Sequence, residues 1–195
     1  MRNSTINSNT RGRPRKFDEK VALSKAAKLF SEKGYSATSL DDLSHAMELK
    51  RPSIYNAFGN KESIFIKAVD NYFNRIATPL AKALKNESIE QAFDDFFSRL
   101  LDFYCEDNNG CMATSTMPVE SSTNDSIKNF YGIIMTKIDA LIQNRLEQEW
   151  PSEKQMLRAQ LLQALMQTLS LRARCGVQRS DLENLYQFGL QKILQ

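Results

Sequence analysis

A short polar segment between residues 50 and 56 carries side chains that could recognise DNA. In the major groove, arginine side chains hydrogen-bond to guanine and asparagine side chains to adenine. Arg51 and Asn56 are therefore candidates for contacts with base edges. Lys50 and Ser53 could reach either bases or phosphates. On an isolated helix the same residues would form an ordinary solvated face. The choice between these interpretations depends on the elements that position the segment.

The residues before this segment predict a short helix followed by a tight turn. Ser39, with Asp42 three residues later, forms a capping-box pattern that opens a helix. The apolar residues of this helix share one face at helical period, and they are Leu40, Leu43 and Met47. A turn through Glu48 and Leu49 follows the helix.

A second helix is predicted after the turn, because Pro52 stands where proline is favoured in a first helical turn. Its inward residues are Ile54 together with Tyr55 or Phe58. Two short helices in this order predict a helix-turn-helix, whose second helix presents side chains to base edges and phosphates.

The motif resembles the N-terminal domain of TetR/AcrR-type transcriptional regulators, in the subclass whose recognition segment reads close to KRPS(I/L)YNAFGNKE. The matching residues run from Lys50 to Glu62, and the match extends back through Gly34-Tyr35-x-x-Thr38-Ser39. It covers about the first third of the 195 residues. Glu48 stands where the family usually has a turn glycine and Ser44 where it usually has alanine, which predicts a slightly strained or opened turn.

The resemblance implies that Thr38, Tyr55 and Lys61 bind phosphates, although Tyr55 could equally be a core aromatic with an exposed hydroxyl. Asn60 is a predicted N-cap, which places Lys61 in a first helical turn where backbone N–H groups favour a phosphate. The predicted DNA contacts in the motif are Thr38, Ser39, Lys50, Arg51, Pro52, Ser53, Tyr55, Asn56 and Lys61.

A basic arm precedes the motif. Residues 1–10 are rich in Asn, Ser and Thr and are predicted to be disordered, and the sequence RGRPRK follows at 11–16. The arm could track phosphates or enter the minor groove, and the alternative is a solvated tail. Its predicted DNA contacts are Arg11, Arg13, Arg15 and Lys16.

Charge is distributed unevenly along the chain. Residues 1–62 hold 12 Lys and Arg against 7 Asp and Glu, a balance of +5. Residues 63–195 hold 14 against 16, a balance of −2. The asymmetry suits a polyanion as the partner of the N-terminal part and ligand or partner binding in the remainder.

Several classes of protein are disfavoured by the composition. Cys105, Cys111 and Cys175 have neither disulfide nor metal-site spacing, and the polar N-terminus lacks a signal-peptide apolar region, so we expect a cytoplasmic protein. No apolar run approaches the about 20 residues that span a bilayer, so we expect no membrane partner. His45 is the only histidine, and no phosphate-binding glycine loop or nucleophile elbow occurs. We therefore expect no enzymatic activity, no metal and no cofactor.

The chain as a whole predicts helices only and therefore an all-α fold. A helix at 17–34 completes a three-helix helix-turn-helix domain at 17–62, after a disordered basic arm at 1–16. Its predicted inward residues are Val21, Ala22, Ala26, Leu29 and Phe30. Residues 63–195 form a larger helical domain, which the resemblance assigns to ligand binding and dimerisation. Its first helix runs from 64 to about 84, where Pro79 ends or kinks it.

Apolar side chains of the larger domain could line a ligand cavity, as the resemblance implies, or could be ordinary core. The candidate pocket residues are Phe65, Val69, Phe73, Phe96, Leu100, Phe103, Cys111, Phe130, Tyr131 and Ile134. Cys111, near a predicted helix start, has two interpretations of its own. It is either a thiol whose pKa the helix dipole lowers, reacting with electrophiles or oxidants, or a buried small apolar residue.

The last two helices, at about 153–174 and 181–194, carry apolar stripes that could close the core of one subunit or pair two subunits. The stripes are Leu157, Leu161, Ala164, Leu165 and Leu169, then Leu182, Leu185, Tyr186, Leu190 and Ile193. The resemblance implies a homodimer through these helices. Two recognition helices one DNA turn apart, about 34 Å, also need a rigid dimer.

The sequence therefore predicts a DNA-binding transcriptional regulator, specifically a homodimeric repressor that binds a pseudo-palindromic operator in double-stranded DNA and is released by an unknown small-molecule effector. One alternative is a helical small-molecule-binding protein with weak or no DNA binding. Another is a redox- or electrophile-responsive regulator that acts through Cys111.

Overall fold

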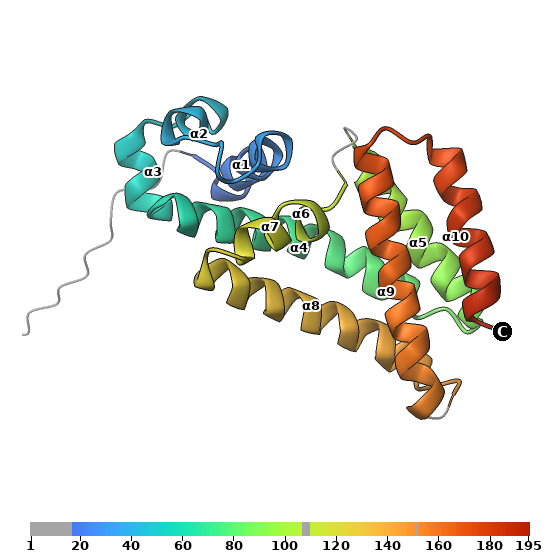
Figure 1. Cartoon of the computed structure of the whole chain (residues 1–195). Coiled ribbons are helices and arrows are strands. Elements are labelled where there is room, and N and C mark those ends of the chain that lie inside the picture. Colours follow the sequence, from blue (N-terminus) through green and yellow to red (C-terminus); the bar gives the residue numbers. More distant parts are fainter. Residues whose placement is uncertain (1–16, 107–109, 151) are drawn as a thin grey trace, which may run out of the picture.

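The computed structural model describes residues 17–106, 110–150 and 152–195, and within these ranges it contains ten α-helices and no strand (Figure 1). The predicted all-α fold is confirmed. The predicted arm at 1–16 lies outside the described residues.

Three short helices form the N-terminal unit, namely α1 (Glu19–Lys33), α2 (Leu40–Ala46) and α3 (Arg51–Phe58). Their shared core contains Phe30, Leu43 and Ile54, all fully or almost fully buried. The Asp18 carboxylate caps the start of α1 by accepting hydrogen bonds from the backbone N–H groups of the first turn. This unit matches the predicted helix-turn-helix with one preceding helix.

The position of Val21 corrects the predicted inward face of α1, because its side chain is 53% exposed. The buried stripe of α1 is formed by Ala22, Ala26, Ala27, Phe30 and Ser31. Ala27 and Ser31 shift the centre of the stripe to the side of the helix opposite Val21, since successive residues are about 100° apart around a helix.

A long helix, α4 (Lys61–Ala83), joins the N-terminal unit to the other helices. The Asn60 side chain caps its start by accepting a hydrogen bond from the Ser63 backbone N–H, as predicted. The helix continues past Pro79 to Ala83. Its first turns pack on α1, with the Phe65 ring centroid 5.0 Å from that of Phe30.

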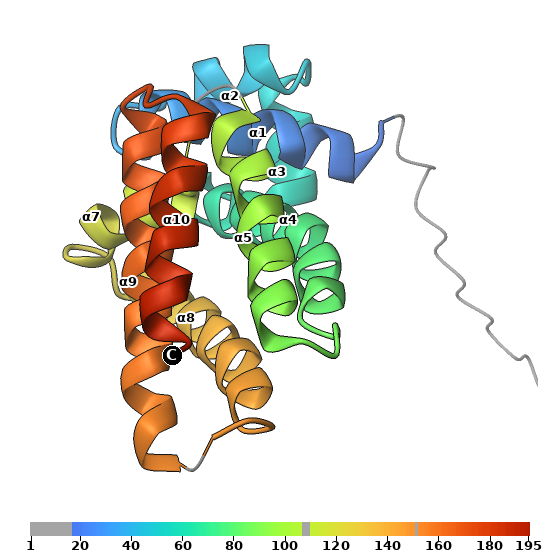
Figure 2. The same ribbon diagram turned by 90° about the vertical axis from the view of Figure 1, so that its right-hand side faces the viewer.

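Six further helices follow: α5 (Ile89–Cys105), α6 (Met112–Ser115), α7 (Met117–Ser121), α8 (Asp125–Leu146), α9 (Ser152–Arg174) and α10 (Arg179–Ile193). Helices α5, α9 and α10 pack against one another, and α8 lies beneath α4 and crosses α9 (Figures 1 and 2). Figure 1 places α3 at one end of the molecule and α9 and α10 at the other, with α4 between them.

Close packing of α9 on α10 is visible at Gly189, where an added Cβ would lie 3.0 Å from a Leu165 methyl carbon. The N-terminus of α10 is tied to α5 by Arg179, whose guanidinium lies 2.8 Å from the Asp102 carboxylate. These contacts join the last two helices to the core of the same chain.

Candidate nucleic-acid interface

The start of α2 is fixed by the predicted capping box. The Ser39 hydroxyl accepts a hydrogen bond from the Asp42 backbone N–H at 3.1 Å, and the Asp42 carboxylate accepts one from the Ser39 backbone N–H at 2.7 Å. Lys33 at the end of α1 donates to the same carboxylate at 2.7 Å. The bonds from Lys33 and Ser39 hold the pKa of Asp42 well below its usual range.

The turn between α2 and α3 places Glu48 at φ 56°, in the left-handed region that favours glycine. The predicted strain at this position is therefore present. The Ser44 hydroxyl donates to the Leu49 carbonyl at 2.6 Å, and the Glu48 carboxylate pairs with Lys25 of α1 at 2.7 Å. The Ser44 hydrogen bond thus stabilises the turn in which Glu48 has a strained backbone conformation.

Helix α3 buries Ile54 and Phe58 and exposes the rest of its polar surface. The Tyr55 ring is 49% exposed, so this residue is not a core aromatic. The exposed predicted contacts on and beside α3 are Lys50, Arg51, Pro52, Ser53, Tyr55 and Asn56. They form one outward surface at the end of the molecule occupied by α3 in Figure 1.

Arg51 has a partner that sequence reasoning missed. Its Nε donates to Oδ1 of Asp41 at 2.6 Å, and its Nη2 contacts the same oxygen. The carboxylate raises the pKa of Arg51 further above its ordinary value. The signal in the sequence is the pair Asp41-Asp42: Asp42 is explained by the capping box, and Asp41 is not.

The other predicted phosphate contacts are placed differently. Thr38 is buried, and its hydroxyl donates to the Gly34 carbonyl at 2.6 Å. The Lys61 ammonium lies 4.4 Å from the centroid of the Tyr35 ring and donates to the Ser36 carbonyl at 3.3 Å. Partial burial lowers the pKa of Lys61. The predicted arm contacts Arg11, Arg13, Arg15 and Lys16 lie outside the described residues.

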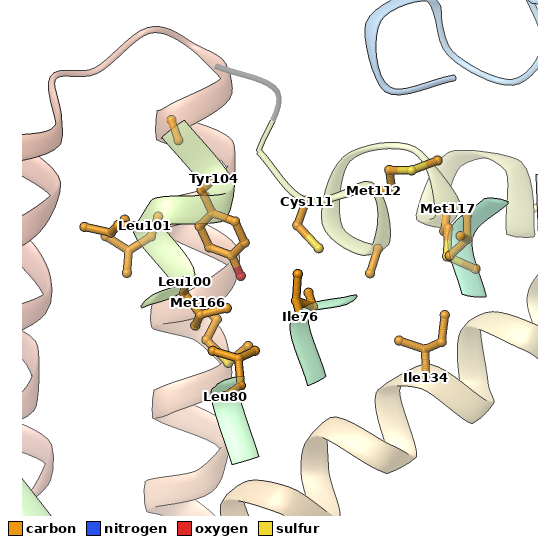
Figure 3. Packing of buried hydrophobic residues seen from close by; sticks show 14 of the residues in the cluster. Ile76, Leu80, Leu100, Leu101, Tyr104, Cys111, Met112, Met117, Ile134 and Met166 are labelled. Atoms are coloured by element: carbon orange, nitrogen blue, oxygen red, sulfur yellow. The ribbon is translucent and has the colours of Figure 1, made fainter. Parts of the chain in front are cut away.

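A cavity of about 130 Å³ lies in the larger helical part, between α4, α5, α8 and α9. Five predicted pocket residues line it, and they are Phe73, Phe96, Leu100, Cys111 and Ile134. Sequence reasoning missed Met166 and Gln163, because neither belongs to the predicted apolar stripe of α9. Figure 3 shows Leu80, Met166 and Ile134 around the space below Cys111.

The other predicted pocket residues do not line this cavity. Phe65 and Val69 are fully buried on the part of α4 that packs against α1. Phe103 borders a separate groove between α1 and α4, with its ring centroid 5.7 Å from the Arg75 guanidinium carbon. Phe130 and Tyr131 are half-buried on α8 and pack against the core.

Cys111 is buried among Ile76, Tyr104 and the start of α6 (Figure 3). Burial raises the pKa of its thiol to about 11, and backbone hydrogen bonds to Ala113 and Thr114 only partly oppose this. The expectation that a helix dipole lowers this pKa is wrong, because α6 is only four residues long and the thiol is shielded from water. The interpretation of Cys111 as a buried small residue is confirmed.

Two polar contacts join the corner between α7 and α8 to the segment before α2 and to the first turn of α4. The Glu120 carboxylate accepts hydrogen bonds from the Ser36 hydroxyl, the shorter at 2.9 Å, and from the Ser36 backbone N–H at 3.3 Å. The Asn124 amide donates to the Glu62 carboxylate at 2.7 Å. This bond, with one to Ser126, lowers the pKa of Glu62. The corner is therefore hydrogen-bonded both to the chain before α2 and to the first turn of α4.

Helix α9 has apolar residues on two faces. Leu162 and Leu169 are buried in the core, whereas Leu157 is 61% exposed and Leu161 is also exposed. Phe188 of α10 is 62% exposed. The predicted stripe on α9 is thus divided between the core and the outer surface.

Within the described residues, no helix is both long and apolar enough to cross a membrane. In the same part of the chain, no group of three or more His, Cys, Asp or Glu side chains is placed to hold a metal ion.

The sequence is similar to known bacterial regulators. The family described as "Bacterial regulatory proteins, tetR family" matches residues 22–68. The HTH-type transcriptional repressor ComR of Escherichia coli (strain K12) is 32% identical over 190 residues, covering 92% of this chain and 89% of that protein. The HTH-type transcriptional repressor BdcR of the same strain is 37% identical over 76 residues, covering 39% of each.

Solved structures share the fold. A cysteine mutant of the TetR family transcriptional regulator CifR, complexed with 26 bp double-strand operator DNA, has a TM-score of 0.81 at 22% identity. The alignment covers 92% of this chain and 98% of that one. A TetR transcriptional regulator from Legionella pneumophila has a TM-score of 0.80 at 23% identity, covering 92% and 99% of the two chains.

Proposed function

The chain belongs to the tetR family of bacterial regulatory proteins, and from this we propose that it is a transcriptional repressor that binds a pseudo-palindromic operator in double-stranded DNA as a homodimer. The observation that carries the proposal is the orientation of α3, which buries Ile54 and Phe58 and turns its polar side chains outward. A helix anchored in this way can enter the major groove with its N-terminal residues against the bases.

In this proposal Arg51 and Asn56 read bases, and Lys50, Ser53, Tyr55 and the basic arm contact phosphates or the neighbouring groove. Thr38 and Ser39 lie at the N-terminus of α2, and Lys61 lies at that of α4. Helix N-termini favour anions because unpaired backbone N–H groups point outward there. Residues 17–62 act as the DNA-binding domain, residues 63–195 as the ligand-binding and dimerisation domain, and the protein works in the cytoplasm, where its DNA partner lies.

Dimerisation uses the outer face of α9 and the neighbouring face of α10. Exposed leucines of α9 and the exposed Phe188 of α10 provide an apolar surface for a second copy of the chain. A two-fold axis through this surface would leave the α3 helix of each subunit outside the interface, and an operator with half-sites about 34 Å apart requires two such helices.

The effector we propose is a small, mostly apolar molecule in the cavity beneath Cys111. The cavity of about 130 Å³ is comparable with an engineered cavity of about 150 Å³ that holds benzene. A larger effector must displace α8 or α9. Movement of α8 would pull on Asn124 and Glu62, and so change the position of α3 relative to its partner in the dimer.

A selection experiment tests the DNA-binding proposal. The full chain is incubated with randomised duplexes at several salt concentrations, and the retained DNA is sequenced. We expect enrichment of an inverted repeat by the wild-type chain and by Arg99→Ala, an exposed arginine on α5, but not by Arg51→Ala. Only weak, salt-sensitive retention without an enriched sequence would contradict the proposal and favour a ligand-binding protein that has lost DNA affinity.

A further inference from the structure

Asp41 lies in the first turn of α2 but is not used to cap it, since Ser39 and Asp42 form the capping box. Its carboxylate instead reaches Arg51 at the start of α3. Both side chains are more than half exposed, at 64% and 53%, so the pair lies on the surface that the proposed function turns toward DNA. A surface ion pair of this kind adds little to folding stability. Stability therefore does not explain why Asp41 pairs with a residue that faces the proposed DNA site.

We propose that Asp41 is a positioning residue that orients the Arg51 guanidinium for a guanine, so that the pair determines one base of each operator half-site. The inference rests on the proposed function. Asp41 occupies the guanidinium edge formed by Nε and Nη2. The remaining edge, formed by Nη1 and Nη2, presents two parallel N–H donors, which is the arrangement that guanine O6 and N7 accept.

The carboxylate affects specific and non-specific binding in opposite directions. An exposed arginine without a partner samples many rotamers and can turn to any phosphate, whereas a paired one is already ordered. A negative charge beside DNA also repels phosphates, so Asp41 weakens binding to arbitrary sequences. Asp41 therefore increases discrimination between bases and decreases affinity for DNA in general.

The test compares the wild-type chain with Asp41→Ala, Arg51→Ala and the double variant, with Glu32→Ala as a control that removes an exposed acid from α1. Affinities are measured for the operator that the wild-type chain enriches, for operators in which each guanine is substituted in turn, and for a random duplex. The guanine assigned to Arg51 is the one whose substitution weakens binding by the wild-type chain but not by Arg51→Ala. We expect Asp41→Ala to lower the guanine preference about 5- to 20-fold, part of the discrimination that one bidentate pair supplies.

Binding of Asp41→Ala to the random duplex should become tighter, with a salt slope steeper by up to about 0.9 per subunit, as the released arginine pairs with a phosphate. In the Arg51→Ala background the same substitution should leave the guanine preference unchanged. Glu32→Ala should behave as the wild-type chain does.

Three results would overturn the inference. The first is an unchanged guanine preference in Asp41→Ala. The second is an equal loss of specific and non-specific binding in Asp41→Ala, which would mean that the pair only holds α2 against α3. The third is an effect of Glu32→Ala equal to that of Asp41→Ala. If the wild-type chain enriches an inverted repeat and Asp41→Ala prefers the guanine as strongly as the wild-type chain does, only this inference fails. If the wild-type chain enriches nothing, the proposed function fails and the inference fails with it.

Discussion

At the scale of single residues, the helix-turn-helix contains a strained backbone position that neighbouring side chains compensate. Glu48 adopts φ 56°, which costs a residue with a side chain about 1–2 kcal/mol relative to its preferred conformation. Ser44 and Lys25 each contribute one contact to the same turn. The turn keeps its geometry because these contacts oppose its opening.

Two substitutions at Glu48 separate the strain from the ion pair. Both Glu48→Gly and Glu48→Ala remove the contact with Lys25, but only glycine adopts this conformation without strain. We expect Glu48→Gly to have a free energy of unfolding about 1–2 kcal/mol higher than Glu48→Ala. Urea denaturation at one fixed protein concentration measures the difference, and equal stabilities would show that the turn is unstrained.

The thiols are predicted to differ in reactivity according to their burial. Cys175 is exposed, Cys105 is half-buried, and Cys111 is buried with a pKa of about 11. We expect iodoacetamide at pH 8 to modify Cys175 first and Cys111 last, as followed by mass spectrometry. Rapid modification of Cys111 at this pH would restore the reactive-cysteine alternative.

The same burial gives a pH dependence of stability. A thiol whose pKa is higher in the folded chain than in the unfolded chain favours folding below the unfolded pKa, here 9.0. This contribution is lost as pH rises toward about 11. The melting temperature of each chain is measured at pH 7 and again above pH 9. The decrease between the two should be smaller in Cys111→Ala than in the wild-type chain.

At the scale of helices, the corner between α7 and α8 adds a polar contact to the packing of α4 on α1. Glu120 accepts bonds from Ser36, and Asn124 donates to Glu62. Helix α8 also lines the cavity through Ile134. One rigid helix thus contacts both the proposed effector and the start of α4.

Removal of the Glu120 carboxylate should loosen the segment before α2. In Glu120→Ala we expect backbone amides at 35–38 to exchange hydrogen about tenfold faster, as the loss of a charged hydrogen bond implies. Glu106→Ala, which removes an exposed partner of Arg75, is the control and should leave these amides unchanged. No difference between the two variants would mean that the corner does not restrain the N-terminal unit.

Sequence reasoning located the helices well where local contacts define their ends. The Ser39–Asp42 capping box and the Asn60 cap were predictable from a few neighbouring residues. The buried face of α9 was not predictable in this way, because α9 has leucines on two faces and periodicity then identifies no single apolar stripe. The contact of Asp41 with Arg51 was missed for a related reason, since it depends on how α2 lies against α3.

At the scale of the whole molecule, helices α9 and α10 lie at the opposite end from α3 (Figure 1), and both carry exposed apolar side chains. In the described chain Leu157, Leu161, Leu171 and Phe188 are all exposed on these two helices. Exposed apolar side chains gathered on two neighbouring helices are typical of an interface between subunits.

Introduction of a charge on this surface should separate the subunits. We expect Leu161→Glu to be monomeric in sedimentation experiments at micromolar concentration, because burying an unpaired carboxylate is costly. Its operator affinity should fall tenfold or more, since each subunit then binds only one half-site. Ile133→Glu, at an exposed apolar position of α8, is the matched control and should remain dimeric. A dimeric Leu161→Glu would place the interface elsewhere.

Helix α9 borders the cavity with Met166 and Gln163 and exposes Leu161 on its other side. A single helix therefore separates the proposed effector from the proposed partner subunit. By mass action, a compound that binds better when α9 is held by a second subunit must bind less tightly as the protein is diluted. The apparent dose of effector needed for release should consequently depend on how many copies of the repressor a cell contains.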